Sequence, residues 1–185
     1  MKHGKIFVVS APSGAGKTTL CGIMLKKNPE LSYSVSHTTR APRANEKESI
    51  DYFFITKDDF QQGIEKKIWA EWAMVHDNYY GTSLEFIKEK IASGSRLLLD
   101  IDVCGAEQIK KTFPEAVTIF IMAPSFKVLE QRLFSRGTDS EDVIKKRLQN
   151  AETEIASREF YDHVIVNNDL DKAAMEMDKI VNGEW

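Results

Sequence analysis

The sequence of 185 residues contains little cysteine and no long hydrophobic run. Its two cysteines, Cys21 and Cys104, are far apart, which excludes a disulfide framework or a zinc site built from clustered thiolates. Both lie in apolar segments, so we expect buried thiols and a reducing compartment. The apolar run at residues 6–9 is too short for a secretion signal or a membrane span. We therefore expect a cytoplasmic protein with no membrane partner.

The chain also lacks an excess of positive charge. It has 25 Lys and Arg against 28 Asp and Glu, a formal net charge of −3 at pH 7. Because binding to nucleic acid depends on a basic surface, we expect no nucleic-acid partner. The four histidines are scattered without ligand spacing, so the sequence does not favour a histidine-centred site. Monomer and homodimer both remain open.

Four short apolar runs stand out, at residues 6–9, 97–101, 117–122 and 164–166. They are continuous rather than alternating, as expected for strands of a parallel sheet that is covered on both faces. Helical patterns follow or separate them at residues 18–27, 84–92, 107–112, 125–134, 140–157 and 170–181. This alternation predicts an α/β core.

The stretch 33–83 has a different pattern. Its segments are short and rich in aromatic and β-branched residues, with one helical piece at 58–66. We predict a small mixed or antiparallel sheet inserted into the α/β core. The core then comprises residues 1–32 and 84–185.

A glycine-rich segment joins the strand at 6–9 to the following helix. Gly14 and Gly16 let the backbone wrap a phosphate, Lys17 can reach the β- and γ-phosphates, and Thr18 can ligate Mg²⁺. The strict pattern G-x-x-x-x-G-K-[ST] is missed by one residue, since Ala11 replaces its first glycine. The alternative is a glycine-rich turn that binds nothing. The candidate ATP-binding residues here are Ala11, Pro12, Ser13, Gly14, Ala15, Gly16, Lys17, Thr18 and Thr19.

Two carboxylates, Asp100 and Asp102, stand at the end of the strand 97–101. Ligands of open α/β sheets bind at this edge. One interpretation is a metal-binding carboxylate, with Asp100 and Thr18 as the candidate ligands. A second is substrate binding, and a third is that one aspartate caps the next helix.

Arg40 and Arg43 flank a proline that stiffens the backbone between them. Two guanidinium groups on a rigid turn can hold a phosphate or a carboxylate. Tyr52, Tyr79 and Tyr80 could donate hydroxyl hydrogen bonds to the same anion. The alternative is a pair of solvated surface arginines.

Taken together, these segments resemble guanylate kinase of the bacterial type. The resemblance is carried by residues 10–18, 36–43 with Glu46 and Tyr52, 78–81, 99–102, Arg132, 136–137, 146–148 and 164–168. It covers essentially the whole chain in the family's order. It implies a P-loop NTPase-type three-layer α/β fold with a parallel core sheet, a GMP-binding insert at 33–83 and a helical lid at 125–157.

The resemblance also implies a reaction, the transfer of the γ-phosphoryl group of ATP to GMP, and also to dGMP, with Mg²⁺. Lys17, Arg40, Arg132, Arg136 and Arg147 would be catalytic, and Asn167 and Asn168 would lie near the adenine. The implied GMP-binding residues are Ser36, Arg40, Arg43, Glu46, Tyr52, Glu71, Tyr80, Thr82, Asp100 and Asp102.

Chemistry supports two of these implications independently. Guanine presents an N1–H and an N2–H₂ donor that one carboxylate such as Glu71 can accept, and adenine lacks this donor pair. Transfer to a phosphate oxygen that is already ionised needs positioning and charge stabilisation rather than a strong base.

Two alternatives stay open: a kinase of the same fold with another small phosphorylated acceptor, and a non-catalytic guanylate-kinase-like binding module. Asn45 and Ser49 stand where the family usually has glycines, so the shape of the turn before Tyr52 also remains open.

Overall fold

The computed structural model describes residues 4–75, 77–135, 137 and 140–183. Its core is a five-stranded sheet in the order β2-β7-β1-β8-β9, and every pair of neighbours is parallel. The strands are β1 Lys5–Ser10, β2 Leu31–Tyr33, β7 Arg96–Asp100, β8 Val117–Met122 and β9 His163–Val166. The predicted α/β fold with a parallel core sheet is confirmed.

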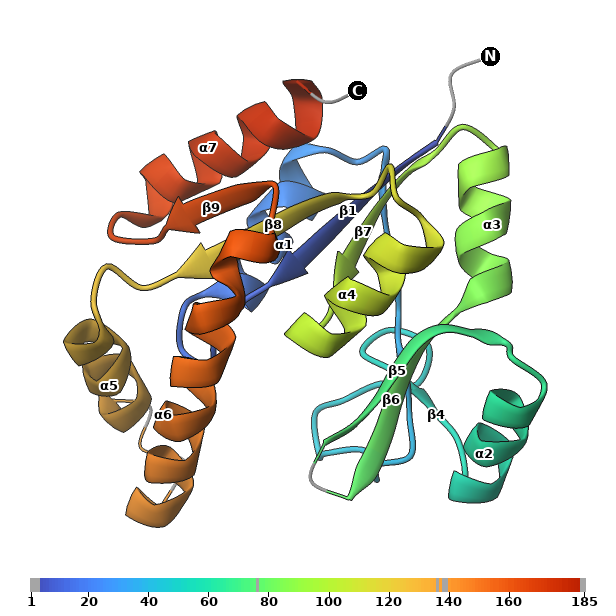
Figure 1. Cartoon of the computed structure of the whole chain (residues 1–185), viewed down its shortest axis with the longest axis horizontal. Coiled ribbons are helices and arrows are strands. Elements are labelled where there is room, and N and C mark those ends of the chain that lie inside the picture. The colour runs from blue at the N-terminus through green and yellow to red at the C-terminus, as the bar shows by residue number, and fades with distance from the viewer. Residues whose placement is uncertain (1–3, 76, 136, 138–139, 184–185) are drawn as a thin grey trace.

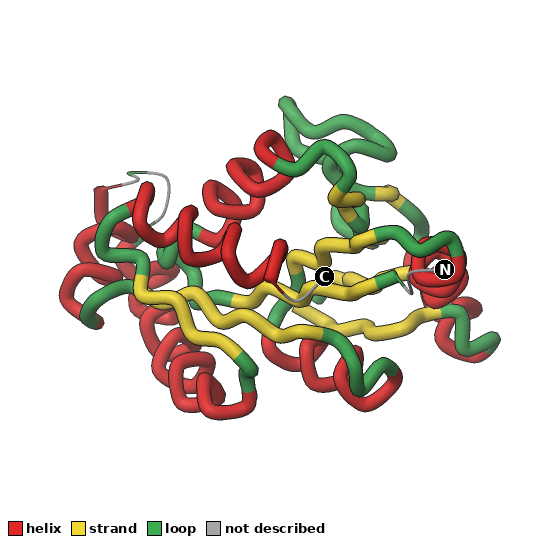
Figure 2. Tube along the Cα trace, turned by 90° about the horizontal axis from the view of Figure 1, so that it is seen from above, coloured by secondary structure: helices red, strands yellow, loops and turns green. Residues whose placement is uncertain are grey.

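Helices cover both faces of this sheet and make three layers (Figures 1 and 2). The helices α1 Lys17–Lys27 and α7 Leu170–Gly183 pack on one face, and α3 Leu84–Ala92 and α4 Val103–Thr112 on the other. After β8 the chain forms α5 Phe126–Ser135 and α6 Glu141–Ala156, then a 3₁₀ turn at Ser157–Phe160 before β9. None of the helices in the described ranges is long and apolar enough to span a membrane.

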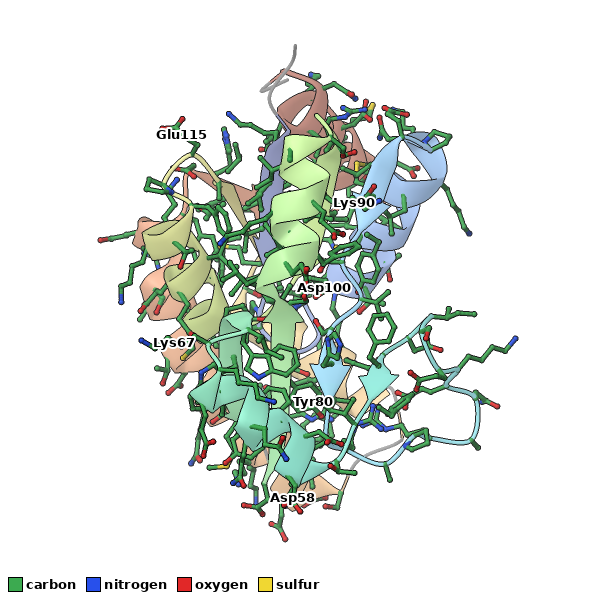
Figure 3. All side chains as sticks on the ribbon, turned by 90° about the vertical axis from the view of Figure 1, so that its right-hand side faces the viewer. Asp58, Lys67, Tyr80, Lys90, Asp100 and Glu115 are labelled. Atoms are coloured by element: carbon green, nitrogen blue, oxygen red, sulfur yellow. The ribbon has the colours of Figure 1, made fainter. Side chains whose placement is uncertain are left out.

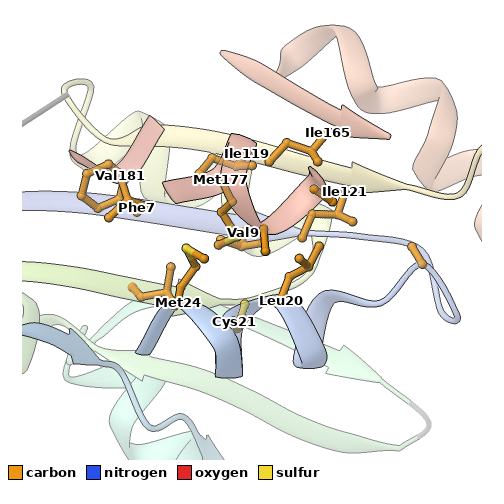
Figure 4. Packing of buried hydrophobic residues seen from close by; sticks show 14 of the residues in the cluster. Phe7, Val9, Leu20, Cys21, Met24, Ile119, Ile121, Ile165, Met177 and Val181 are labelled. Atoms are coloured by element: carbon orange, nitrogen blue, oxygen red, sulfur yellow. The ribbon is translucent and has the colours of Figure 1, made fainter. Parts of the chain in front are cut away.

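The central strand β1 explains why its apolar run is continuous. Phe7 and Val9 point into a cluster with Leu20 and Met24 of α1 (Figure 4). Their neighbours on the strand point to the opposite face, into a second cluster that contains Ile87 of α3. Because both faces of a covered parallel strand are dry, every position favours an apolar side chain.

The insert is a four-stranded sheet in the order β4-β3-β6-β5. Its strands are β3 His37–Thr38, β4 Phe53–Phe54, β5 Trp69–Val75 and β6 Asn78–Ser83. The β3–β4 pair is parallel and the other two pairs are antiparallel, so the sheet is mixed. The helix α2 Lys57–Glu65 packs on it through Phe60, whose ring stacks on Trp69 and Tyr79 at centroid distances of 4.5 and 5.0 Å. In the view of Figure 1, the insert and the pair α5–α6 both lie below the core sheet, on opposite sides.

Three expectations from the sequence are wrong. Residues 31–33 form the edge strand β2 of the core sheet, whereas no strand was expected at 31–32 and Tyr33 was assigned to the insert. The helix α4 begins at Val103 rather than at residue 107, because the Asp102 carboxylate accepts a hydrogen bond from the Gly105 amide at 2.7 Å and caps it. Cys21 is buried as expected, but Cys104 is exposed on α4.

Candidate functional site

The glycine-rich segment forms a tight loop between β1 and α1. Gly14 and Gly16 have φ angles of +93° and +100°, a conformation that costs an L-residue about 1–2 kcal/mol. The Ala15 amide donates to the Pro12 carbonyl at 3.0 Å, which closes the turn. Since Gly16 precedes the first turn of α1, the free amides of that turn face the loop, as in anion-binding loops.

Lys17 lies between this loop and the end of β7. Its Nζ is 2.5 Å from Oδ1 of Asp100 and donates to the Ile101 carbonyl at 3.1 Å. Burial is the largest single influence and lowers the pKa of Lys17, but the interactions with nearby acidic groups, chiefly Asp100, together raise the net pKa above its ordinary value. The ammonium group is therefore charged, and a phosphate entering the loop would compete with Asp100 for it.

Two cavities meet at this lysine. A cleft of about 420 Å³ between the core and the insert is lined by Ser13, Lys17, Ser36, Tyr52, Glu71, Ala73, Val75, Tyr80, Asp100, Ile101 and Asp102. A second cavity of about 310 Å³ is lined by Ala11, Pro12, Ser13, Gly14, Gly16, Lys17, Thr18, Thr19, Asp102 and Glu154. Ser13, Lys17 and Asp102 line both, so the two cavities adjoin. Figure 3 shows Asp100 at the core side of this junction and Tyr80 below it in the insert.

Glu71 is a buried carboxylate in the wall of the larger cleft, with 4% of its surface exposed. Its Oε1 accepts a hydrogen bond from the Thr82 hydroxyl at 2.5 Å on the neighbouring strand. Burial raises the pKa of Glu71 to about 7, against the lowering effect of the Thr82 hydrogen bond. Asp102 lies close enough to contribute to this increase, and it lines both cavities besides capping α4.

The two arginines of the insert have different environments. Arg40 donates to Oε1 of Glu46 at 2.8 Å and to the Tyr80 hydroxyl at 3.3 Å, and its guanidinium group lies 5.4 Å from the centroid of the Tyr52 ring. Its pKa is raised, chiefly by the hydrogen bond to Glu46. The Arg43 side chain is 74% exposed, and its backbone amide donates to the other oxygen of Glu46 at 2.8 Å. Glu46 thus orders the turn and directs Arg40 toward two residues of the cleft wall.

Two arginines after β8 contact the phosphate-loop region. Arg132 of α5 donates to the Asn167 carbonyl at 2.9 Å, and Arg147 of α6 donates to the Ser13 hydroxyl at 3.1 Å. Arg136, the third arginine predicted there, lies outside the described residues.

The two asparagines after β9, Asn167 and Asn168, differ in burial and in hydrogen bonding. The buried Asn167 donates its side-chain amide to the Ala15 carbonyl at 2.8 Å and so ties the loop to β9, a contact that the sequence did not suggest. Asn168 is exposed, and its backbone amide donates to the Val166 carbonyl.

Glu154 of α6 was missed in the sequence and lines the smaller cavity. Burial raises its pKa to about 7, with Lys17 acting in the opposite direction. Glu154 lies seven residues after Arg147, a spacing that places both side chains on one face of the helix. This spacing is the sequence pattern that could have indicated Glu154 as a site residue.

The oxygen donors at the junction fit Mg²⁺ chemistry. Thr18 lines the smaller cavity, and Asp100 stands at the end of β7 in the adjoining cleft. No cluster of three or more side chains able to hold a metal ion occurs in the described residues. Magnesium on nucleotide phosphates usually takes one or two carboxylates besides phosphate and water oxygens, so Thr18 and Asp100 are the residues here that could hold it.

A phosphate loop at the end of a parallel strand, joined through its lysine to a second polar cleft, defines the class of P-loop nucleotide kinases. Comparison with known proteins narrows this class. The family model described as guanylate kinase matches residues 3–184. The chain therefore belongs to the guanylate kinase family, whose enzymes transfer a phosphoryl group from ATP to GMP.

Individual relatives agree with this assignment. The chain is 45% identical over 184 residues to guanylate kinase of Carboxydothermus hydrogenoformans, covering 100% of this chain and 90% of the relative. It is 47% identical over 181 residues to that of Neisseria gonorrhoeae, covering 98% and 88%. The crystal structure of guanylate kinase from Anaplasma phagocytophilum superposes with a TM-score of 0.82 at 32% identity, covering 100% of this chain and 87% of that one.

Proposed function

We propose that this chain transfers the γ-phosphoryl group of ATP to GMP at the junction of its two cavities. The phosphates of ATP lie on the loop 11–19, and GMP occupies the cleft of about 420 Å³. The observation that carries the proposal is that Ser13, Lys17 and Asp102 line both cavities. Two nucleotides in adjoining cavities can bring a donor phosphorus and an acceptor oxygen together.

The transfer depends on positioning and charge. The attacking oxygen of GMP is already ionised, so no general base is required. Lys17 exchanges part of its interaction with Asp100 for the phosphates of ATP. Arg132 and Arg147 supply further positive charge from the far side of the loop. Thr18 and Asp100 would hold Mg²⁺, which would neutralise charge on the phosphates.

Acceptor recognition uses both ends of GMP. Ionised Glu71 accepts from the guanine N1–H and N2–H₂ groups, and Thr82 holds its orientation. Asp102 contributes a second carboxylate to the base site. Ser36, Arg40, Tyr52 and Tyr80, with Arg43 and Glu46 behind them, bind the phosphate of GMP. Because these contacts concern base and phosphate only, we also propose dGMP as an acceptor.

We propose a core at 1–33, 84–124 and 158–185, a GMP-binding insert at 34–83 and a lid at 125–157, with Tyr33 moved to the core because it belongs to β2. Closure of insert and lid over two nucleotides would exclude water from the transfer. Asn167 and Asn168 at the end of β9 are assigned to the adenine side. The enzyme is proposed to act in the cytoplasm, as a monomer or a homodimer.

The test is a coupled assay of ADP release with GMP, dGMP, AMP, CMP and UMP as acceptors. We expect turnover with GMP and dGMP, and turnover at least about tenfold lower with the others, since an unpaired buried carboxylate penalises them. Turnover with AMP, CMP or UMP but not GMP would establish a kinase for another acceptor. ATP binding without turnover on any acceptor would establish a binding module.

A further inference from the structure

Gly105, in the first turn of α4, stands against the carboxylate of Glu71. A Cβ atom built on Gly105 would lie 2.6 Å from Oε2 and 3.2 Å from Cδ of Glu71, and at a less severe 3.3 Å from Oδ1 of Asp102. Contacts between a Cβ and an oxygen at 2.6 Å do not occur in folded proteins, so any other residue at position 105 must displace the carboxylate or the helix. Glu71 reaches its position only because residue 105 has no side chain.

Backbone conformation does not explain this glycine. Gly105 is helical, and positive φ angles occur at Gly14, Gly16, Gly94 and Gly137 but not at Gly105. Glycine in a helix is less favourable than alanine by about 1 kcal/mol. Steric space for a neighbouring side chain is therefore what favours glycine here.

The displaced group is the one that faces the cleft. Thr82 fixes Oε1 of Glu71 at 2.5 Å, and Oε2 lies toward Gly105 at the N-terminus of α4. A carboxylate that accepts two donors of guanine in parallel must keep both oxygens aligned with them. A movement forced by a methyl group at position 105 would break either the Thr82 hydrogen bond or this alignment.

We propose that Gly105 is a specificity-determining positioning residue: the space at its Cα sets the orientation in which Glu71 accepts both donors of guanine. This inference rests on the base-reading role proposed for Glu71. It predicts that Gly105→Ala weakens binding of GMP by about 10- to 100-fold, the cost of losing a hydrogen bond to a charged group. Glu71 does not line the cavity assigned to ATP, so the affinity for ATP is expected to change by less than about twofold.

Calorimetric titration of the full chain with GMP, with IMP and with ATP separates this role from general damage. IMP lacks the exocyclic amine of guanine, so it loses less from a misaligned carboxylate. We expect the ratio of GMP to IMP affinity to fall by about tenfold in Gly105→Ala. Gly22→Ala is the matched control, because Gly22 is also helical and a Cβ there meets nothing within 4 Å.

A double-mutant cycle with Glu71→Ala tests the mechanism, because the effect of Gly105→Ala should depend on the presence of the Glu71 carboxylate. Without the Glu71 carboxylate, Gly105→Ala is expected to leave the remaining GMP affinity unchanged and to raise the melting temperature as Gly22→Ala does. If Gly105→Ala lowers the melting temperature equally with and without Glu71, or weakens ATP binding as much as GMP binding, the inference is overturned.

The same variants test the role of Gly105 separately from the proposed base-reading role of Glu71. If Glu71→Ala binds GMP normally, the base-reading role of Glu71 fails. If Glu71→Ala weakens GMP binding but Gly105→Ala leaves both the GMP affinity and the GMP to IMP ratio unchanged, only the role of Gly105 fails.

Discussion

Replacing Glu71 with glutamine is expected to stabilise the protein and, in the same variant, to weaken its binding of GMP. The pKa of Glu71 is about 7 in the folded chain, against an ordinary value of 4.5, because the carboxyl group is buried. Below pH 4.5 the Glu71 carboxyl group is protonated in both the folded and the unfolded chain. Its preference for the protonated form in the folded chain then contributes fully to stability. As the pH rises toward 7 the unfolded chain ionises first, so this contribution is lost.

The size of the effect follows from these two values. The difference between 4.5 and about 7 corresponds to about 3 kcal/mol of unfolding free energy. Glutamine has the same shape, carries no charge, and its carbonyl can still accept the Thr82 hydrogen bond. The stability gain of Glu71→Gln over the unmodified chain should thus grow from near zero at pH 4.5 to about 3 kcal/mol at pH 8.

The assay is urea-induced unfolding at several values between pH 4.5 and pH 8, with Glu115→Gln as the control. Glu115 is exposed and lies near the upper edge of the molecule in Figure 3, away from Asp100. Parallel stability profiles for Glu71→Gln and the unmodified chain over this range would refute the reasoning from burial.

Binding provides the second half of this prediction. At pH 8 the GMP dissociation constant of Glu71→Gln should rise by about 10- to 100-fold, because an amide cannot accept both guanine donors. In the unmodified chain the affinity for GMP should fall below pH 7 as Glu71 gains its proton. The variant should retain only the titration of the GMP phosphate near pH 6. An unchanged dissociation constant at pH 8 would remove Glu71 from the base site.

Three further outcomes are expected. Lys17→Ala should reduce turnover by at least about 100-fold in the ADP-release assay while GMP still binds; near-normal turnover would contradict the role of Lys17. Removal of Mg²⁺ with EDTA should abolish transfer, reversibly on adding Mg²⁺, and activity that persists in the chelator would exclude the proposed ion. Ser49→Gly should raise the unfolding free energy by about 0.5–1 kcal/mol, since Ser49 has a φ of +62°; a melting temperature that stays the same or falls would show that Ser49 carries no strain.

Ser49 also answers a question that the sequence left open. Serine stands where the family usually has glycine, and it adopts the left-handed conformation nonetheless. Its amide donates to the Tyr52 carbonyl at 2.9 Å, so the turn that precedes Tyr52 is formed. Serine in place of glycine at position 49 therefore adds backbone strain to this turn but does not prevent the turn from forming.

The sequence by itself determined the features that depend on local pattern. Continuous apolar runs predicted four of the five core strands, because strands covered on both faces admit few polar side chains. The order glycine, lysine, threonine between a strand and a helix predicted the phosphate loop, because one short segment supplies both its conformation and its charge. The strand β2 was missed because a three-residue edge strand with one buried side chain, Leu31, leaves almost no pattern.

Only the tertiary structure decided which of these residues meet. The ion pair of Lys17 with Asp100, the hydrogen bond of Asn167 to the phosphate loop, and the space that Gly105 leaves for Glu71 each join segments far apart in the chain. Side-chain burial, and with it the raised pKa of Glu71, likewise depends on what packs around a residue rather than on its neighbours in sequence. Local pattern fixes conformation and residue type, whereas distances and desolvation arise only when the layers assemble.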